Sequence, residues 1–144
     1  MLIGGEMATT ERILGSQRQE LANELRRKVS GEVKFDPFSR VLYSTDASIY
    51  QMEPIGVVIP RNVEDVLAII EVAKTNKVPI LPRAGGTSLA GQTVNHAIVT
   101  DFSKYLNQII EVNVDEQWAR VQPGIVLDDL NRQLKRYGLM YAPD

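Results

Sequence analysis

The chain has 144 residues and a mass of 16.1 kDa, which is the size of a single domain. Its net charge of -2, its pI of about 5.5 and the absence of a long basic run make nucleic acids and anionic membranes poor candidate partners. With no cysteine and one histidine, the chain cannot form a disulfide, a cysteine-ligated iron–sulfur cluster or a histidine-rich metal site from its own residues.

The N-terminal part of the chain predicts one helix followed by short extended pieces. We expect residues 1–10 to be disordered or derived from an expression vector, and residues 11–144 to form the folded portion. Apolar residues recur every three or four positions over residues 11–29, which predicts a helix. The segment 33–44 is weakly patterned and contains Pro37, so we interpret it as short extended pieces.

A strand–helix–strand unit is predicted next. The continuous apolar run at residues 55–59 is typical of a strand buried on both faces. Asn62 can cap the following helix, which carries one apolar stripe and closes at residues 76–77. Residues 78–81 form the second strand. Because the links are short, these two strands should be parallel.

Further strands and a helix are predicted in the C-terminal half of the chain. Residues 96–101 predict a strand, 108–114 and 117–122 a hairpin, and 123–138 a helix with its stop. Residues 139–141 begin another extended piece shortly before the chain ends, which suggests a fragment of a longer domain; a short native C-terminus is the alternative. The expected fold class is α+β, with a small parallel βαβ layer followed by partly antiparallel strands and helices.

A glycine-rich loop, PRAGGTSLAGQ at residues 82–92, directly follows the second strand of the βαβ unit. A turn without Cβ atoms at the carboxyl end of a parallel strand lets backbone N–H groups close on phosphate oxygens. Each hydrogen bond to an anion is worth roughly 1.5–3 kcal/mol. Thr87 and Ser88 add two hydroxyl groups, and Arg83 can offset negative charge. The alternative is a tightly turned surface loop without a ligand.

Two common phosphate-binding motifs do not fit this loop. The dinucleotide motif GxGxxG fails because the glycines stand at positions 85, 86 and 91. The triphosphate-binding motif GxxxxGK[ST] nearly fits from Gly86 to Gly91, but Gln92 stands where the motif needs a lysine. A neutral amide cannot supply that positive charge, so the sequence disfavours a nucleotide triphosphatase.

Together with the upstream stretch GVVIPRNVEDV, the glycine loop resembles the FAD-binding domain of the vanillyl-alcohol oxidase and p-cresol methylhydroxylase (PCMH) superfamily. The nearest branch is the FAD-linked oxidases of the glycolate oxidase D-subunit and D-lactate dehydrogenase kind. The resemblance continues through IVTDFSKYLNQIIEVNVDEQWARVQPGIVLDDLNRQL and covers about residues 40–144. It implies that main-chain amides of the loop wrap the FAD diphosphate. The implied cofactor contacts are Arg83, Ala84, Gly85, Gly86, Thr87, Ser88 and Leu89, with Gly91 and Gln92 near the flavin side.

The resemblance also implies how the flavin is held and what the chain lacks. Some relatives have, at the position of Thr87, a histidine bonded covalently to the flavin; Thr87 cannot form that bond, so we expect non-covalent FAD. A second flavin-binding stretch and a substrate domain would follow residue 144. No residue of this chain is expected to be catalytic or to bind a metal.

The parent protein is expected to be an enzyme that oxidises a 2-hydroxy acid, of the D-lactate or glycolate type, to the 2-oxo acid. FAD would accept the hydride equivalent and pass electrons to a further acceptor. The fragment alone is expected to be inactive. In the alternative interpretation, it binds no flavin and acts only as a folded scaffold or association module, and its exposed apolar surface favours self-association.

Other residues and segments have simpler interpretations. His96 has no acidic or cysteine neighbours in sequence and is interpreted as a structural or surface histidine. Asp101, at the end of a strand, is expected to cap the next turn, with ligand binding as the alternative. The start MLIGGEMATTERILG lacks the features of a signal peptide, and no stretch approaches the ~18 apolar residues of a membrane span. We expect a cytoplasmic protein.

Overall fold

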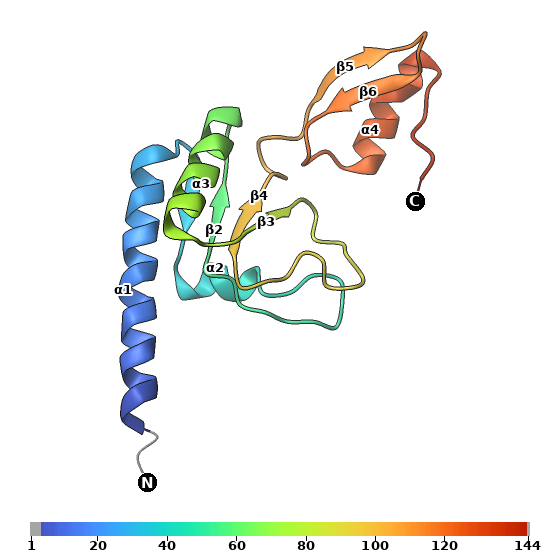
Figure 1. Cartoon of the computed structure of the whole chain (residues 1–144). Helices are drawn as coiled ribbons and strands as arrows, with labels where there is room; N and C mark the ends of the chain where they lie inside the picture. The colour runs from blue at the N-terminus through green and yellow to red at the C-terminus, as the bar shows by residue number, and fades with distance from the viewer. Residues whose placement is uncertain (1–3, 144) are drawn as a thin grey trace.

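The computed structural model describes the backbone of residues 4–143 and the side chains of residues 15–143. One part of the chain carries three helices and a four-stranded sheet, and a hairpin with a further helix stands apart from it (Figure 1). The helices are α1 (Gly4–Lys28), α2 (Pro37–Leu42), α3 (Val63–Asn76), α4 (Leu127–Leu134) and the 3-10 turn η1 (Lys135–Tyr137). The strands are β1 (Glu32–Lys34), β2 (Gly56–Ile59), β3 (Ile80–Arg83), β4 (Ile98–Asp101), β5 (Ile109–Asn113) and β6 (Trp118–Val121).

The main sheet has the strand order β1-β2-β4-β3. Strands β2, β4 and β3 are parallel, and β1 pairs antiparallel with β2 at the edge. The predicted β2–α3–β3 unit is therefore confirmed as parallel, but β4 lies between its two strands. Val99 in β4 is aligned with Val57 on one side and Leu81 on the other. All residues of β2 and β4 are buried, as the continuous apolar run of β2 predicted.

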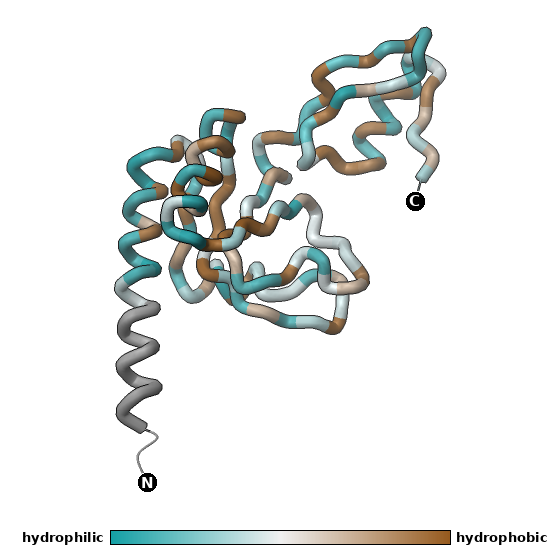
Figure 2. Tube along the Cα trace, in the orientation of Figure 1, coloured by the Kyte–Doolittle hydropathy of each residue, from teal (hydrophilic) through white to brown (hydrophobic). Residues whose placement is uncertain are grey.

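Two helices cover one face of this sheet. Helix α1 packs against α3 and β1, and apolar side chains from both helices meet those of β2 and β4. Leu25, Ile69, Val58 and Ile98 are completely buried in this layer. The apolar stretch of β2 stands out in the hydropathy colouring (Figure 2). This core fixes the sheet from which the long loops extend.

The side chains of Asn62 and Asp65 accept the hydrogen bonds that hold the start of α3. Asn62 Oδ1 accepts from the N–H of Asp65 at 2.8 Å, which confirms the predicted cap. The Asp65 carboxylate, 3% exposed, accepts from the N–H groups of Ser30 and Arg61, both at 2.8 Å. Burial alone would raise the pKa of Asp65, but these hydrogen bonds outweigh burial and lower it. The carboxylate therefore joins the end of α1 to the start of α3.

Two sequence-based expectations near the N-terminus were wrong. Residues 37–42 form helix α2 instead of an extended piece, because Asp36 caps it by accepting from Ser39 N at 2.8 Å and Pro37 occupies its first turn. Helix α1 begins at Gly4 rather than near Glu11, so it is longer at its N-terminal end than the apolar periodicity predicted. Residues 1–3 lie outside the described part of the chain.

The C-terminal part of the chain pairs β5 with β6 as the predicted hairpin, and α4 lies against it (Figure 1). Helix α4 begins at Leu127, later than expected, because Gly124 is tied to the preceding segment by its N–H bond to Leu106 O at 2.8 Å. Leu130 and Leu134 are its buried residues. Among the described residues, none of the helices is sufficiently long and apolar to cross a membrane.

Candidate functional site

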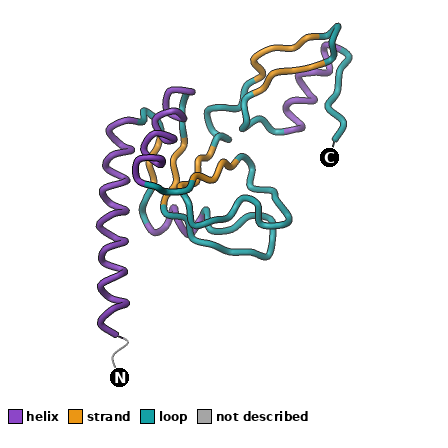
Figure 3. Tube along the Cα trace, in the orientation of Figure 1, coloured by secondary structure: helices purple, strands orange, loops and turns teal. Residues whose placement is uncertain are grey.

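The glycine loop begins where β3 ends, at the carboxyl edge of the parallel strands. It belongs to a long stretch without helix or strand, residues 84–97, that returns the chain to the start of β4 (Figure 3). The N–H of Phe102 donates to Arg83 O at 2.9 Å, so the ends of β3 and β4 are held together. Of the predicted cofactor residues, Arg83 is the last residue of β3 and the others lie on this loop.

The backbone of the loop has free hydrogen-bond donors. Gly86 and Gly91 have φ angles of 67° and 77°, in the left-handed region that favours glycine. Within the described residues, the N–H groups of residues 85–89 donate to no hydrogen-bond acceptor. Five consecutive donors at a strand's carboxyl end are the type of group that receives phosphate oxygens.

The side chains of Ser88 and Gln92 hold the loop from inside. Ser88 Oγ accepts from the N–H of Gln92 at 3.1 Å and from that of Ala90 at 3.4 Å, and it donates to Gln92 Oε1. This turn keeps the peptide from Ser88 to Gln92 closed. Ser88 and Gln92 are therefore engaged with each other, whereas the Thr87 hydroxyl makes no hydrogen bond within the described residues.

The Arg83 side chain supports the loop from within the fold. Its guanidinium donates to the carbonyls of Thr93 at 3.2 Å and Tyr43 at 3.4 Å, and it lies 5.2 Å from the centroid of the Tyr43 ring. A Cβ atom at Gly86 would lie 2.4 Å from Arg83 Nη2, so the loop backbone rests directly on the guanidinium. Arg83 thus brings a positive charge to the loop, while its guanidinium donates hydrogen bonds to backbone carbonyl groups.

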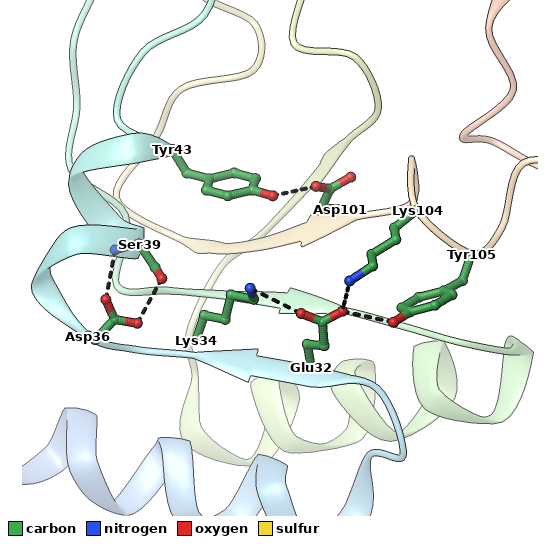
Figure 4. A network of polar contacts seen from close by, with 8 residues as sticks. All are labelled: Glu32, Lys34, Asp36, Ser39, Tyr43, Asp101, Lys104 and Tyr105. Carbon is green, nitrogen blue, oxygen red and sulfur yellow. Dashed lines mark hydrogen bonds and ion pairs between the residues drawn. The ribbon is translucent and has the colours of Figure 1, made fainter.

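A tyrosine–aspartate pair stands beside the start of the loop (Figure 4). Tyr43 Oη donates to Asp101 Oδ2 at 2.5 Å, and Ser103 N donates to Asp101 Oδ1 at 2.8 Å, which confirms that Asp101 caps the turn after β4. Burial, followed by the hydrogen bond to the Asp101 carboxylate, raises the pKa of Tyr43. These residues share a shallow hollow of about 270 Å³ with Leu42, Ala84 and Gly85.

A second loop, residues 44–52, lies against the glycine loop; we name it the strap. The Ala47 N–H donates to Gly86 O at 3.1 Å, and Asp46 Oδ2 accepts from Thr93 Oγ1 at 2.9 Å. The Tyr50 ring lies where a Cβ at Gly91 would reach, 2.7 Å from Tyr50 Cδ2. Sequence reasoning missed the strap and Tyr43, because the segment YSTDASIY shows no periodicity and its partners lie far along the chain.

The remaining candidates stay outside this site. His96 is exposed, and its Nδ1 lies 3.0 Å from the Glu53 carbonyl, in agreement with a surface role. In the part of the chain that the structure describes, no group of three or more His, Asp or Glu side chains could hold a metal ion.

Residues 54–144 match the family model described as "FAD binding domain". The chain is 41% identical over 118 residues to D-2-hydroxyglutarate dehydrogenase of Escherichia coli K12, covering 80% of this chain and 12% of that protein. It is 38% identical over 122 residues to glycolate oxidase subunit GlcD of Bacillus subtilis 168, covering 81% of this chain and 26% of that protein. The chain therefore spans only a small part of the curated relatives that it matches.

Solved structures show the same fold at low sequence identity. An alkyldihydroxyacetonephosphate synthase matches with a TM-score of 0.71 and 23% identity, over 83% of this chain and 25% of that chain. A p-cresol methylhydroxylase with substrate bound matches with a TM-score of 0.67 and 17% identity, over 86% of this chain and 25% of that chain. These likenesses confirm the expected α+β architecture of the PCMH type.

Proposed function

Because the chain belongs to the FAD binding domain family, we propose that its glycine loop holds the diphosphate of FAD for a flavoenzyme that oxidises a 2-hydroxy acid. The contacts fall on Arg83, Ala84, Gly85, Gly86, Thr87, Ser88 and Leu89, with Gly91 and Gln92 toward the flavin. The observation that carries the proposal is the run of free N–H groups at residues 85–89, at the end of β3.

The loop suits a diphosphate for electrostatic and steric reasons. Hydrogen bonds from N–H groups to an anion are each worth roughly 1.5–3 kcal/mol. A Cβ at Gly85 would make only an ordinary van der Waals contact, with Thr87 Cγ2 at 3.6 Å. A bare backbone at that point lets phosphate oxygens approach the amides closely. The Arg83 guanidinium beneath Gly86 adds a fixed positive charge that favours the bound anion.

We propose that FAD is held without a covalent bond. Thr87 offers a hydroxyl instead of an imidazole, and the chain has no cysteine. Its one histidine, His96, has Nδ1 3.0 Å from the Glu53 carbonyl. The loop therefore anchors the cofactor through hydrogen bonds and charge, with Ser88 and Gln92 keeping the turn closed.

The proposed parent reaction converts a 2-hydroxy acid to a 2-oxo acid. The two relatives named above act, by their names, on D-2-hydroxyglutarate and glycolate, and a third relative, from Kluyveromyces lactis, is a D-lactate dehydrogenase. All three compounds are 2-hydroxy acids. When bound, FAD supplies the redox chemistry by accepting a hydride equivalent, and the electrons then pass to a separate acceptor. In this proposal, the role of this chain is to anchor and orient the cofactor.

A fluorescence titration tests the cofactor role. FAD titrated with the purified chain should lose fluorescence in a saturable way, and inorganic diphosphate should compete. Magnesium–ATP should not protect the loop from proteolysis as FAD does. If neither this chain nor the full-length natural protein quenches FAD fluorescence, the proposal is wrong. If only the longer protein binds FAD, the loop is one part of a site that needs the rest of the domain.

A further inference from the structure

The strap (residues 44–52) is a closed unit. Its two ends meet where Met52 N donates to Ser44 O at 2.8 Å and Gln51 Nε2 donates to Ser44 Oγ at 3.2 Å. Thr45 and Gln51 also form an isolated antiparallel bridge. Asp46 Oδ1 accepts from Ser48 N at 2.9 Å inside the turn. The strap therefore holds its own shape and can act as a fixed support for a neighbouring segment.

The strap contacts the glycine loop near both of its glycines with left-handed backbone. At one end, the Ala47 N–H donates to Gly86 O. At the other end, the Tyr50 ring lies against Gly91. Beyond Gly91, Asp46 Oδ2 accepts from both the hydroxyl and the N–H of Thr93, at 2.9 and 3.4 Å. The free N–H groups of residues 85–89 thus lie on a segment fixed from both sides.

The bond to Gly86 O determines where the next N–H points. In a trans peptide the C=O of one residue and the N–H of the following residue point in opposite directions. No cis peptide occurs in the described part of the chain. Because Gly86 O points toward Ala47 of the strap, the N–H of Thr87 points away from the strap. Since it makes no hydrogen bond within the described residues, it is left to face a ligand on that side.

We propose that the strap is the positioning element of the diphosphate loop, and that Asp46 and Thr93 are its positioning residues. This inference rests on the proposed function and adds residues outside the loop itself. Asp46 carries a negative charge beside a site for an anion, which is unfavourable unless the carboxylate is held by donors. Three donor groups, from Ser48 and Thr93, bind it, so Asp46 acts as a tether and makes no contact with the ligand.

If the strap orders the loop before FAD arrives, the affinity for FAD should be higher than with a mobile loop. A loop that is ordered before binding loses less conformational entropy when the ligand arrives. Releasing the tether by Asp46→Ala or Thr93→Val should weaken FAD binding by about tenfold. Because both variants break the same contact, the double variant should bind almost as well as either single one. Thr93→Ser keeps the hydroxyl and should bind FAD like the wild type.

The control variant is Asp129→Ala. It also removes one carboxylate, which pairs with Arg132 on α4, but it lies outside the loop and the strap. It should leave the FAD dissociation constant unchanged. Circular dichroism and thermal melting show whether each variant is still folded. Weaker FAD binding by a folded variant can then be attributed to the loop and not to unfolding of the chain.

A second readout needs no cofactor. Backbone ¹⁵N relaxation of the free protein should show an ordered Thr87 amide in the wild type and in Asp129→Ala, and a mobile one in Asp46→Ala. If Asp46→Ala keeps both the Thr87 order and the wild-type FAD affinity, the strap is not a positioning element. If the wild type and the full-length protein do not bind FAD, the proposed function fails, and relaxation alone then decides whether the strap orders the loop.

Discussion

The hydroxyl of Tyr43 donates a 2.5 Å hydrogen bond to the carboxylate of Asp101, joining the end of α2 to the carboxyl end of β4 (Figure 4). Asp101 is 6% exposed, so water cannot readily replace the phenol as a donor. The Tyr43 ring also lies against the Arg83 guanidinium. One side chain thus couples the helix before the strap to the strand edge that carries the site.

Replacing Tyr43 by phenylalanine tests this connection. Tyr43→Phe keeps the ring beside Arg83 but leaves a buried carboxylate with one donor fewer. We expect the free energy of unfolding to fall by about 1.5–3 kcal/mol, the usual cost of a lost hydrogen bond to a charged group. Urea unfolding measures it. An unchanged urea midpoint would mean that Asp101 finds another donor.

The two adjacent glycines at the start of the loop should respond differently to alanine. Gly86→Ala places a Cβ at a φ angle of 67° and 2.4 Å from the Arg83 guanidinium, so we expect both stability and FAD binding to fall, stability by about 1–3 kcal/mol. Gly85→Ala meets only Thr87 Cγ2 at 3.6 Å, so stability should be preserved.

Gly85→Ala should nevertheless weaken FAD binding, because the added methyl group would stand where the proposed function has phosphate oxygens approach the backbone. Thermal melting and FAD titration of both variants separate the two effects. Wild-type FAD affinity in Gly85→Ala would show that the diphosphate does not approach the loop at this residue.

Replacing the buried carboxylate of Asp65 by an amide should destabilise the fold. Ser30 N donates to one carboxylate oxygen of Asp65 and Arg61 N donates to the other, so Asp65→Asn turns an NH₂ group toward one of these two N–H groups. Since donors would then face donors in a buried site, we expect a loss of about 2–4 kcal/mol of unfolding free energy. Asp128→Asn, at an exposed position in the first turn of α4, is the control and should change stability little. Equal urea midpoints for the two variants would contradict this account.

Acid should weaken the network around Glu32. The hydrogen bond from Lys104 at 2.5 Å, followed by those from Lys34 and Tyr105, lowers the pKa of Glu32 from 4.5 to about 2 (Figure 4). Because the folded pKa is the lower one, this carboxylate stabilises the fold fully above pH 4.5, and the contribution is lost as the pH falls toward 2.

In the wild type, this partly exposed network should make the unfolding free energy fall by about 1 kcal/mol between about pH 5 and 2. Glu32→Gln should therefore remove that part of the pH dependence. Urea unfolding at a series of pH values measures this, and the difference from the wild type should shrink in 1 M salt. Identical pH profiles for wild type and variant would show that the network adds nothing to stability.

Local patterns were enough to predict most of the elements and the position of the loop. The apolar run of β2 and the stripe and cap of α3 are properties of neighbouring residues, so the sequence displays them. The strand before the loop was also predicted, but at residues 78–81, whereas β3 runs from Ile80 to Arg83. Helix α2 was missed because it is short and depends on a single cap, Asp36, and on a proline that is equally common in turns.

Long-range pairing could not be predicted in the same way. β2 and β4 are both short and fully buried, so composition does not indicate which of them lies beside β3. The Asp46–Thr93 contact spans 47 positions between two irregular segments, and neither segment has a periodicity that points to the other. The glycines thus located the loop, whereas the residues that support it became visible only in the folded structure.

The central place of β4 also dictates an order of assembly. This strand pairs with β2 and β3 on its two sides, yet it follows both of them in the chain. While a ribosome is still making the protein, β2 and β3 therefore have no partner between them, and the glycine loop does not yet lead into a paired strand. The connection from β3 through the glycine loop to β4 is complete only after residues 98–101 have emerged and inserted, so in nascent chains that stop earlier the loop should lack its paired strand.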